Sequence, residues 1–317
     1  MPELTAKLAS DAAGQMARAV VGQGEAIEHL IAAVLAGGHV LLEGVPGTAK
    51  TLMVRALAHV VDCDFTRIQF TPDLMPSDII GTYVFHARTG EFELRRGPIF
   101  TTFLLADEIN RAPAKTQSAL LEAMQERQVT IDGIVHPLPP FFTVFATQNP
   151  IEYEGTYPLP EAQLDRFMFK VLIDYPTRDS ENAMLLSHHR GFDPQRLDAA
   201  GLEKAADLHL VQRCREEIAR VVVDEGVIDY MSAITRRTRE APSLLLGCSP
   251  RSSVMLLLAS KALAAMRGRE FVIPDDVQTL AYPVLRHRLL LRPESDIEGL
   301  SPDDIIRSVV AEIEVPR

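Results

Sequence analysis

The chain has 317 residues, of which 47% are hydrophobic and 24% are charged, and its formal net charge is −11. This is the composition of a soluble globular protein that is long enough for two domains with a buried core. The negative charge argues against a general nucleic-acid or membrane-surface binder, although a small basic pore inside an assembly is compatible with it.

The cysteines and the apolar stretches indicate the cellular compartment of the protein. Cys63, Cys214 and Cys248 lie far apart with no paired spacing, which predicts reduced thiols and neither a disulfide framework nor a zinc site. Charged residues interrupt any apolar core of a signal peptide near the start, and the longest apolar stretch, residues 30–42, is too short to span a bilayer. We therefore expect a cytoplasmic protein without membrane insertion.

Two helical patterns open the chain. Apolar residues recur at helical spacing over 4–20 and again over 25–35, and the second pattern stops at Gly37-Gly38. Val21 and Gly22 lie between them, where the glycine allows either a plain turn or a close approach to a flat ligand.

A phosphate-binding loop follows an apolar run at 40–42. Its successive backbone N–H groups, with those that open the next helix, would cradle phosphate oxygens. The expected nucleotide-binding residues are Gly44, Val45, Pro46, Gly47, Thr48, Ala49, Lys50, Thr51 and Leu52. Lys50 would reach the β- and γ-phosphates, and Thr51 would hold Mg²⁺. The alternative is a turn of small residues that binds nothing.

One residue of this loop departs from the usual pattern. Ala49 stands where the general motif has glycine before the lysine. We expect the methyl group to be tolerated because residue 49 would already have right-handed helical backbone angles.

Strands and helices then alternate up to about residue 176. The alternation predicts an α/β fold, with a parallel sheet covered on both faces by helices. Two interruptions are predicted to be β-hairpins, one at 81–97 and one at 128–137, where Asp132-Gly133 is a strong two-residue turn signal. The remaining elements are strands at 65–70, 103–106 and 141–146 and a helix at 116–128.

The pattern changes after Tyr175-Pro176. Helical patterns succeed one another, and 269–273 is the one strand signal among them. We therefore predict an α/β domain at 1–176 and an all-helical domain at 177–317. The expected helices lie at about 179–189, 201–219, 224–238, 250–267, 275–281 and 302–313.

Polar residues follow two of the predicted strands. Asp107 and Glu108 end one strand, and Asn149 follows another. Because ligands bind beyond the carboxyl ends of parallel strands, these residues should meet the phosphate-binding loop at one edge. Asp107 would hold Mg²⁺, Glu108 would polarise the attacking water, and Asn149 would orient that water. The alternatives are a solvated acidic turn and a turn residue before Pro150.

Two arginines are candidates for contact with phosphate. Arg166 could stabilise transition-state charge in its own site or in a neighbour's, and the alternative is an ion pair with Asp165 or another acid. Arg251 follows Ser249 and Pro250, which suit an N-cap and a first helical position. It would then face a phosphate from a helical lid, or it is simply an exposed residue of a first turn. Whether Arg286 and Arg288 also touch nucleotide is left open.

With these residues assembled, the chain resembles AAA+ ATPases and is most similar to their MoxR family. An alanine before the P-loop lysine is familiar in that family, so Ala49 supports the narrower resemblance. The stretches that carry the resemblance are residues 44–51, 105–112, 122–127, 146–150, 155–167 and 249–251.

The resemblance implies roles for single residues. Lys50 and Thr51 would bind phosphate and Mg²⁺, and Asp107 with Glu108 would form the second acidic motif. Asn149 would be sensor 1, Arg166 the finger that acts on the next subunit, and Arg251 sensor 2. The segment with Val21 and Gly22 would back the adenine. The hairpins at 81–97 and 128–137 would be the helix-2 insert and the pre-sensor-1 hairpin, both candidates to face a substrate.

The resemblance also implies a homo-oligomer that uses ATP and Mg²⁺, either a hexamer or a ring that forms with nucleotide. Its client would be a protein, often one with a von Willebrand factor A domain or a metal centre. The alternatives are a magnesium-chelatase-like motor subunit, a nucleic-acid-stimulated motor, which the net charge of −11 disfavours, and a nucleotide-gated scaffold.

Overall fold

The computed structural model describes residues 1–150, 157–198 and 200–316. Its centre is a five-stranded parallel sheet of order β2-β5-β8-β1-β9. The residues of its five strands are mostly apolar and buried, as expected for strands covered on both faces. The strands are β1 (Val40–Gly44), β2 (Phe65–Gln69), β5 (Phe103–Asp107), β8 (Thr143–Gln148) and β9 (Phe169–Ile173).

The predicted α/β core is confirmed, with one strand added. The expected strands at 65–70, 103–106 and 141–146 correspond to β2, β5 and β8. The edge strand β9 was not predicted, because its five residues carry only a short alternation with Lys170 between apolar neighbours. It pairs in parallel with β1, and Phe169 lies opposite Val40 and Ile173 opposite Gly44.

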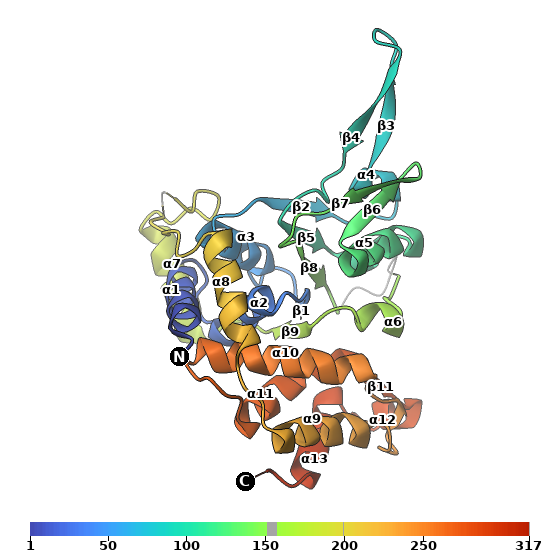
Figure 1. Cartoon of the computed structure of the whole chain (residues 1–317). Coiled ribbons are helices and arrows are strands. Elements are labelled where there is room, and N and C mark those ends of the chain that lie inside the picture. Colours follow the sequence, from blue (N-terminus) through green and yellow to red (C-terminus); the bar gives the residue numbers. More distant parts are fainter. Residues whose placement is uncertain (151–156, 199, 317) are drawn as a thin grey trace.

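Helices cover both faces of the sheet, and two hairpins leave it. The β3–β4 hairpin projects far from the body, as Figure 1 shows at the top of the view. Both hairpins were predicted, and Asp132 and Gly133 have the positive φ angles of 49° and 82° that a tight two-residue turn requires. The helices are α1 (Glu3–Ala19), α2 (Gly24–Ala36), α3 (Lys50–Val60), α4 (Pro76–Ile80), η1 (Ile109–Arg111), α5 (Ala114–Glu126) and α6 (Glu161–Leu164). The hairpin strands are β3 (Gly81–His86), β4 (Glu91–Arg96), β6 (Gln128–Ile131) and β7 (Ile134–Pro137).

The rest of the described chain is mainly helical. Two expectations change: the helix predicted at 201–219 begins only at Leu208, where Asp207 caps it, and the strand signal at 269–273 becomes a single bridge between Val222 and Phe271. The elements are α7 (Arg178–His189), α8 (Leu208–Ala219), α9 (Glu225–Thr238), β10 (Leu244–Leu246), α10 (Pro250–Met266), α11 (Pro274–Leu285), η2 (Arg286–Arg288), β11 (Leu290–Leu291), α12 (Pro293–Ile297) and α13 (Pro302–Glu312). The short antiparallel pair β10–β11 was not predicted.

Two hydrophobic cores lie on the two faces of the sheet. One packs β5 and β8 against α5, and the other joins α1, α2 and α3 to α8, α9, α10 and α11. The second core is continuous across the predicted boundary at residue 176, because α8 packs on α1 and α2. Among the described residues, no helix is both long and apolar enough to cross a bilayer.

Candidate nucleotide site

The loop at residues 44–51 joins β1 to α3 and folds around its own lysine. Lys50 begins α3 and turns back, so that its Nζ donates to the carbonyl oxygens of Gly44 at 2.6 Å and Val45 at 2.8 Å. Thr48 Oγ1 donates to the same Val45 oxygen at 2.9 Å. The loop therefore holds its ammonium group at the centre of the turn, where an anion would meet it.

The backbone at Ala49 differs from our expectation. Its φ of 62° and ψ of 17° are left-handed, not right-handed helical. Steric contact of Cβ with the backbone disfavours this region for any residue but glycine. The methyl group is thus accommodated at a cost, which explains why the general motif has glycine there.

Exchanging Ala49 for glycine is therefore expected to stabilise the protein. The left-handed conformation costs an L-residue about 1–2 kcal/mol, and glycine loses about 0.5–1 kcal/mol through chain entropy. The net gain of roughly 0.5–1 kcal/mol should raise the thermal midpoint by about 1–2 °C. Gly47→Ala is the matched control, because Gly47 has a φ of 83° and an added Cβ meets no atom within 4 Å, so only backbone strain acts. A lower midpoint for Ala49→Gly would contradict the assignment of strain.

The acidic pair lies at the carboxyl end of β5, tied to β8 by one threonine. Thr147 Oγ1 donates to Asp107 Oδ1 at 2.6 Å and accepts from the backbone N–H of Glu108 at 2.8 Å. The other carboxylate oxygen of Asp107 accepts from Arg67 Nε on β2 at 2.9 Å. Thr147 is almost fully buried, so its hydroxyl fixes both acids from one side. Neither Thr147 nor Arg67 was predicted, because polar residues inside a strand look like ordinary alternation.

Glu108 leaves the strand in a strained conformation. Its φ is 57°, and its Oε2 accepts from Gln69 Nε2 at 2.7 Å and from an Arg111 nitrogen at 2.9 Å. Non-glycine residues in the left-handed region cluster at functional sites, where neighbouring contacts hold them. The carboxylate is thus oriented from β2 and from η1 at once.

Register brings these residues to the loop. Glu43 lies opposite Gln148, so the buried Asn149 follows directly beside the start of the loop. Burial lowers the pKa of Lys50, while the nearby charges of Asp107 and Glu108 act in the opposite direction. The lysine, the two acids and the amide therefore share one edge of the sheet, as the sequence predicted.

A cavity of about 250 Å³ continues from the loop toward α7. It is bounded by Val21 and Leu52, which were expected at the nucleotide, and by residues 47–49 of the loop. Gly22 instead lies against α7, where an added Cβ would come within 2.5 Å of Ser180 Oγ. The walls that the sequence did not predict are Tyr175, Pro176, Ser180, Met184, His188 and Phe192.

The two arginines lie away from this loop. Arg166 follows α6, before the amino end of β9, whereas Gly44 pairs with Ile173 at the carboxyl end. The strand between these ends is about 13 Å long. Ser249 donates to Asp165 Oδ2 at 3.0 Å, so Arg251, two residues further, lies near Arg166. Figure 1 shows α6 and β11 on one side of the molecule and α1 and α7 on the other.

Two expectations about these arginines change. The carboxylate of Asp165 pairs with Arg288 at 2.7 Å, not with Arg166. Ser249 takes the N-cap position as predicted, but its hydroxyl makes no capping bond to the backbone of α10 and donates to Asp165, with Ser252 Oγ 3.5 Å away. Among the described residues, neither the Arg166 nor the Arg251 guanidinium has a hydrogen-bond or ion-pair partner.

Comparison with known proteins identifies the family. Residues 39–169 match the model of the ATPase family associated with various cellular activities (AAA), and residues 236–309 match an AAA lid domain. Chaperone MoxR1 of Mycobacterium tuberculosis (strain ATCC 25618 / H37Rv) is 45% identical over 96% of this chain and 81% of its own length. Protein MoxR of Paracoccus denitrificans is 33% identical over 96% of both chains. The chain belongs to the MoxR family of AAA+ ATPases.

Two further relatives support the assignment across the whole length. YeaC of Bacillus subtilis (strain 168), described as uncharacterized, is 48% identical over 94% of this chain and 92% of its own. A crystal structure from Cytophaga hutchinsonii ATCC 33406, described provisionally as an ATPase, has a TM-score of 0.90 and 41% identity and covers 99% of this chain and 98% of its own. The fold of this MoxR-family protein is therefore shared by a solved structure.

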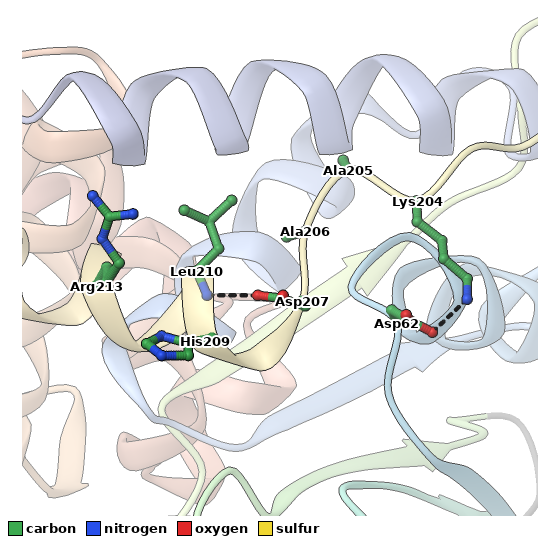
Figure 2. Close-up of a pocket in the computed structure, with 8 residues that line it drawn as sticks. All are labelled: Asp62, Lys204, Ala205, Ala206, Asp207, His209, Leu210 and Arg213. Atoms are coloured by element: carbon green, nitrogen blue, oxygen red, sulfur yellow. Dashed lines mark hydrogen bonds and ion pairs between the residues drawn. The ribbon is translucent and has the colours of Figure 1, made fainter.

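A larger hollow of about 580 Å³ lies elsewhere on the MoxR-family chain, between the end of α3 and the start of α8 (Figure 2). Three of its charged side chains already have partners, since Lys204 Nζ is 2.7 Å from Asp62 Oδ1 and Asp207 Oδ1 accepts from the N–H of Leu210 at 2.8 Å. Its lysine is paired and its aspartate caps a helix, so we assign the chemistry to the loop and not to this hollow.

Replacing Thr147 by valine is expected to damage the MoxR-family site and the fold together. The change keeps the shape but removes a donor to a carboxylate and an acceptor for a backbone N–H, a loss of about 2–3 kcal/mol. Urea unfolding measures the stability, and phosphate release measures the accompanying fall in kcat. Thr143→Val is the control on the same strand, because its hydroxyl bonds the nearby Phe141 carbonyl and, among the described residues, neither acid. Equal behaviour of the two variants would contradict the bridging role of Thr147.

Proposed function

We propose that this chain is a cytoplasmic ATP hydrolase that uses Mg²⁺ and holds the triphosphate on the loop at residues 44–51. The observation that carries the proposal is the meeting of Lys50, Asp107, Glu108 and Asn149 at one sheet edge. A cation, two acids and a neutral amide around a phosphate-binding turn are the groups that phosphoryl transfer to water needs. Family membership supports the same reaction.

In this proposal the residues divide the work. Lys50 exchanges its two backbone carbonyl acceptors for phosphate oxygens, which carry more negative charge and therefore bind the ammonium more strongly. Glu108, held by Gln69 and Arg111, takes the proton of the attacking water. Asn149 orients that water through its amide, and Val21 with Leu52 packs on the base.

The residues present fit a magnesium ion. Mg²⁺ in nucleotide sites takes one or two protein oxygen ligands together with substrate phosphates and water. Thr51 and Asp107 would hold it, and the described residues contain no cluster of three or more His, Cys, Asp or Glu that would suit another metal. When bound, the ion neutralises charge on the β- and γ-phosphates.

We further propose a homo-oligomeric ring, of which a hexamer is the expected form. The distance from Arg166 to its own loop supports action on the nucleotide of a neighbouring subunit. Arg251, which the sequence predicted to face a phosphate, lies near Arg166 and is proposed to act on the same neighbour. The nucleotide cavity at α1 and α7 would then face the arginines of the next subunit.

The cellular task that we propose is remodelling of a protein client. One relative is named a chaperone, and the projecting β3–β4 hairpin exposes 54% of Phe85 and 69% of Phe92, which pack on each other with ring centroids 5.2 Å apart. An exposed aromatic pair on a protruding element suits transient contact with a protein. A client with a von Willebrand factor A domain or a metal centre is the finer form of this proposal.

A phosphate-release assay on the purified chain, with and without Mg²⁺, tests the enzymatic part. Absence of turnover in an assembled, folded preparation would overturn it. A pull-down with Glu108→Gln in ATP tests the client part, with Glu108→Gln/Phe85→Ala/Phe92→Ala as the matched control. A bound protein that survives the loss of both phenylalanines would remove the hairpin from the proposed client contact.

A further inference from the structure

A buried arginine joins the lid to the segment that carries Arg166. The Arg288 side chain is 2% exposed, and its Nε donates to Asp165 Oδ1 at 2.7 Å. Its other nitrogens donate to the backbone oxygens of Asp165 at 3.1 Å, Phe167 at 2.6 Å and Met168 at 3.4 Å, and to that of Val284 in the last turn of α11. One guanidinium therefore fixes the backbone on both sides of Arg166.

The same carboxylate also reaches α10. Asp165 Oδ2 accepts from Ser249 Oγ at 3.0 Å, and Ser249 stands at the N-cap of the helix whose first turn contains Arg251. The hydroxyl makes no capping bond of its own. Asp165 is thus bound through one oxygen to η2 and through the other to the N-cap of α10. Arg166 follows Asp165 directly and Arg251 lies two residues after Ser249, and neither guanidinium has a partner among the described residues.

Burying the Arg288 guanidinium costs more free energy than a surface contact would. A guanidinium taken out of water needs a compensating charge and nearly complete hydrogen bonding, both of which Asp165 and the four carbonyl groups supply. Burial lowers the pKa of Arg288, and Asp165 opposes that shift. A fixed, fully bonded ion pair gives the surrounding backbone one geometry, and a surface pair would not.

We propose that Asp165, clamped by Arg288 and Ser249, is a positioning residue that holds Arg166 and Arg251 as one rigid pair for the nucleotide of the neighbouring subunit. This inference rests on the proposed ATP hydrolysis in a ring. A transition-state arginine loses roughly 10²-fold in rate when it is displaced by about 1 Å. Within the part of the chain that the structure describes, neither guanidinium is held by an ion pair, so their placement depends on the backbone that Asp165 and Ser249 anchor.

Two variants test the clamp at different strengths. Asp165→Asn keeps the shape but removes the charge, and we expect kcat to fall by roughly 10²-fold with the ATP affinity of the subunit's own site unchanged. Ser249→Ala removes the bond from Asp165 to α10 together with a long 3.5 Å contact to Ser252 Oγ, and loss of the one charge-assisted bond predicts a fall in kcat of about tenfold. Ser253→Ala is the matched control, because this hydroxyl on the same helix bonds Thr235 and not Asp165. Its kcat should remain at the wild-type value.

Mixed rings separate positioning from folding. Lys50→Ala subunits bind no ATP but present an intact arginine pair, so equal mixing with Asp165→Asn should give more activity than the two proteins measured apart. A variant that had merely lost its fold would not be rescued. If Asp165→Asn does not fold, mixing Ser249→Ala with Lys50→Ala subunits tests for the same rescue of activity.

The outcomes are distinguishable from failure of the proposed function. Wild-type kcat in folded Asp165→Asn or in Ser249→Ala, or a lowered kcat without rescue in mixed rings, would overturn the clamp. If Arg166→Ala also shows no rescue by Lys50→Ala, action in trans itself fails. If Arg166→Ala is rescued and the clamp variants are fully active, only this inference falls.

Discussion

Replacing Glu108 by glutamine is expected to stop ATP turnover while ATP still binds. The amide keeps the size of the side chain and can still accept from Gln69 and Arg111, so the strained turn at this position should persist. It cannot take a proton from water, and loss of a general base lowers the rate by about 10²–10⁴-fold. Phosphate release measures the loss, and titration with a fluorescent ATP analogue measures the retained affinity.

Lys50→Ala is the control for this result. Its ammonium group is the centre of the phosphate-binding turn, so its removal should abolish binding and turnover together. The two variants therefore fail at different steps of one reaction. Normal turnover by purified Glu108→Gln would remove Glu108 as the general base and would leave the acid pair with only a role in metal binding.

Motifs that are contiguous in the sequence were predictable in detail. The loop at 44–51 and the Asp107-Glu108 pair each combine a strand, its end and a characteristic set of side chains. Their meeting followed from one rule about parallel strands. The rule places whole strand ends, so it could predict that Asn149 approaches the loop without knowledge of any side-chain conformation.

Contacts that depend on neighbouring strands were not predictable. Gln69, Arg67 and Thr147 hold the two acids, but each sits in a strand where an occasional polar residue is ordinary. Only the lateral order β2-β5-β8 brings them to one point. The left-handed backbone at Ala49 has the same origin, since the angles follow from how the loop closes and not from its composition.

The position of Arg251 illustrates the limit most clearly. A helix that begins with Ser249 and Pro250 predicts a positive end suited to phosphate, and the predicted start of the helix is confirmed. It does not say which phosphate. The bond from Ser249 to Asp165 determines the direction, and the partners of that bond are 84 residues apart in the sequence.

Arg166→Ala is the second change with a large expected effect. An arginine that stabilises the charge of a transferring phosphoryl group is worth roughly 10³–10⁵-fold in rate, so the variant alone should be almost inactive. Its own loop, acids and cavity are untouched, because Arg166 lies beyond the far end of β9. ATP affinity should therefore stay at the wild-type value, which separates this variant from Lys50→Ala.

Mixing the two inactive variants gives the decisive measurement. A Lys50→Ala subunit cannot bind ATP but can offer Arg166 to its neighbour, and an Arg166→Ala subunit can bind ATP but offers no arginine. If Arg166 acts across the interface, a mixed ring contains complete sites. Its activity should then rise with the number of interfaces at which a Lys50→Ala subunit offers Arg166 to an Arg166→Ala subunit. If the arginine served its own subunit, no arrangement of these two chains would contain a complete site, and the mixture would stay as inactive as its parts.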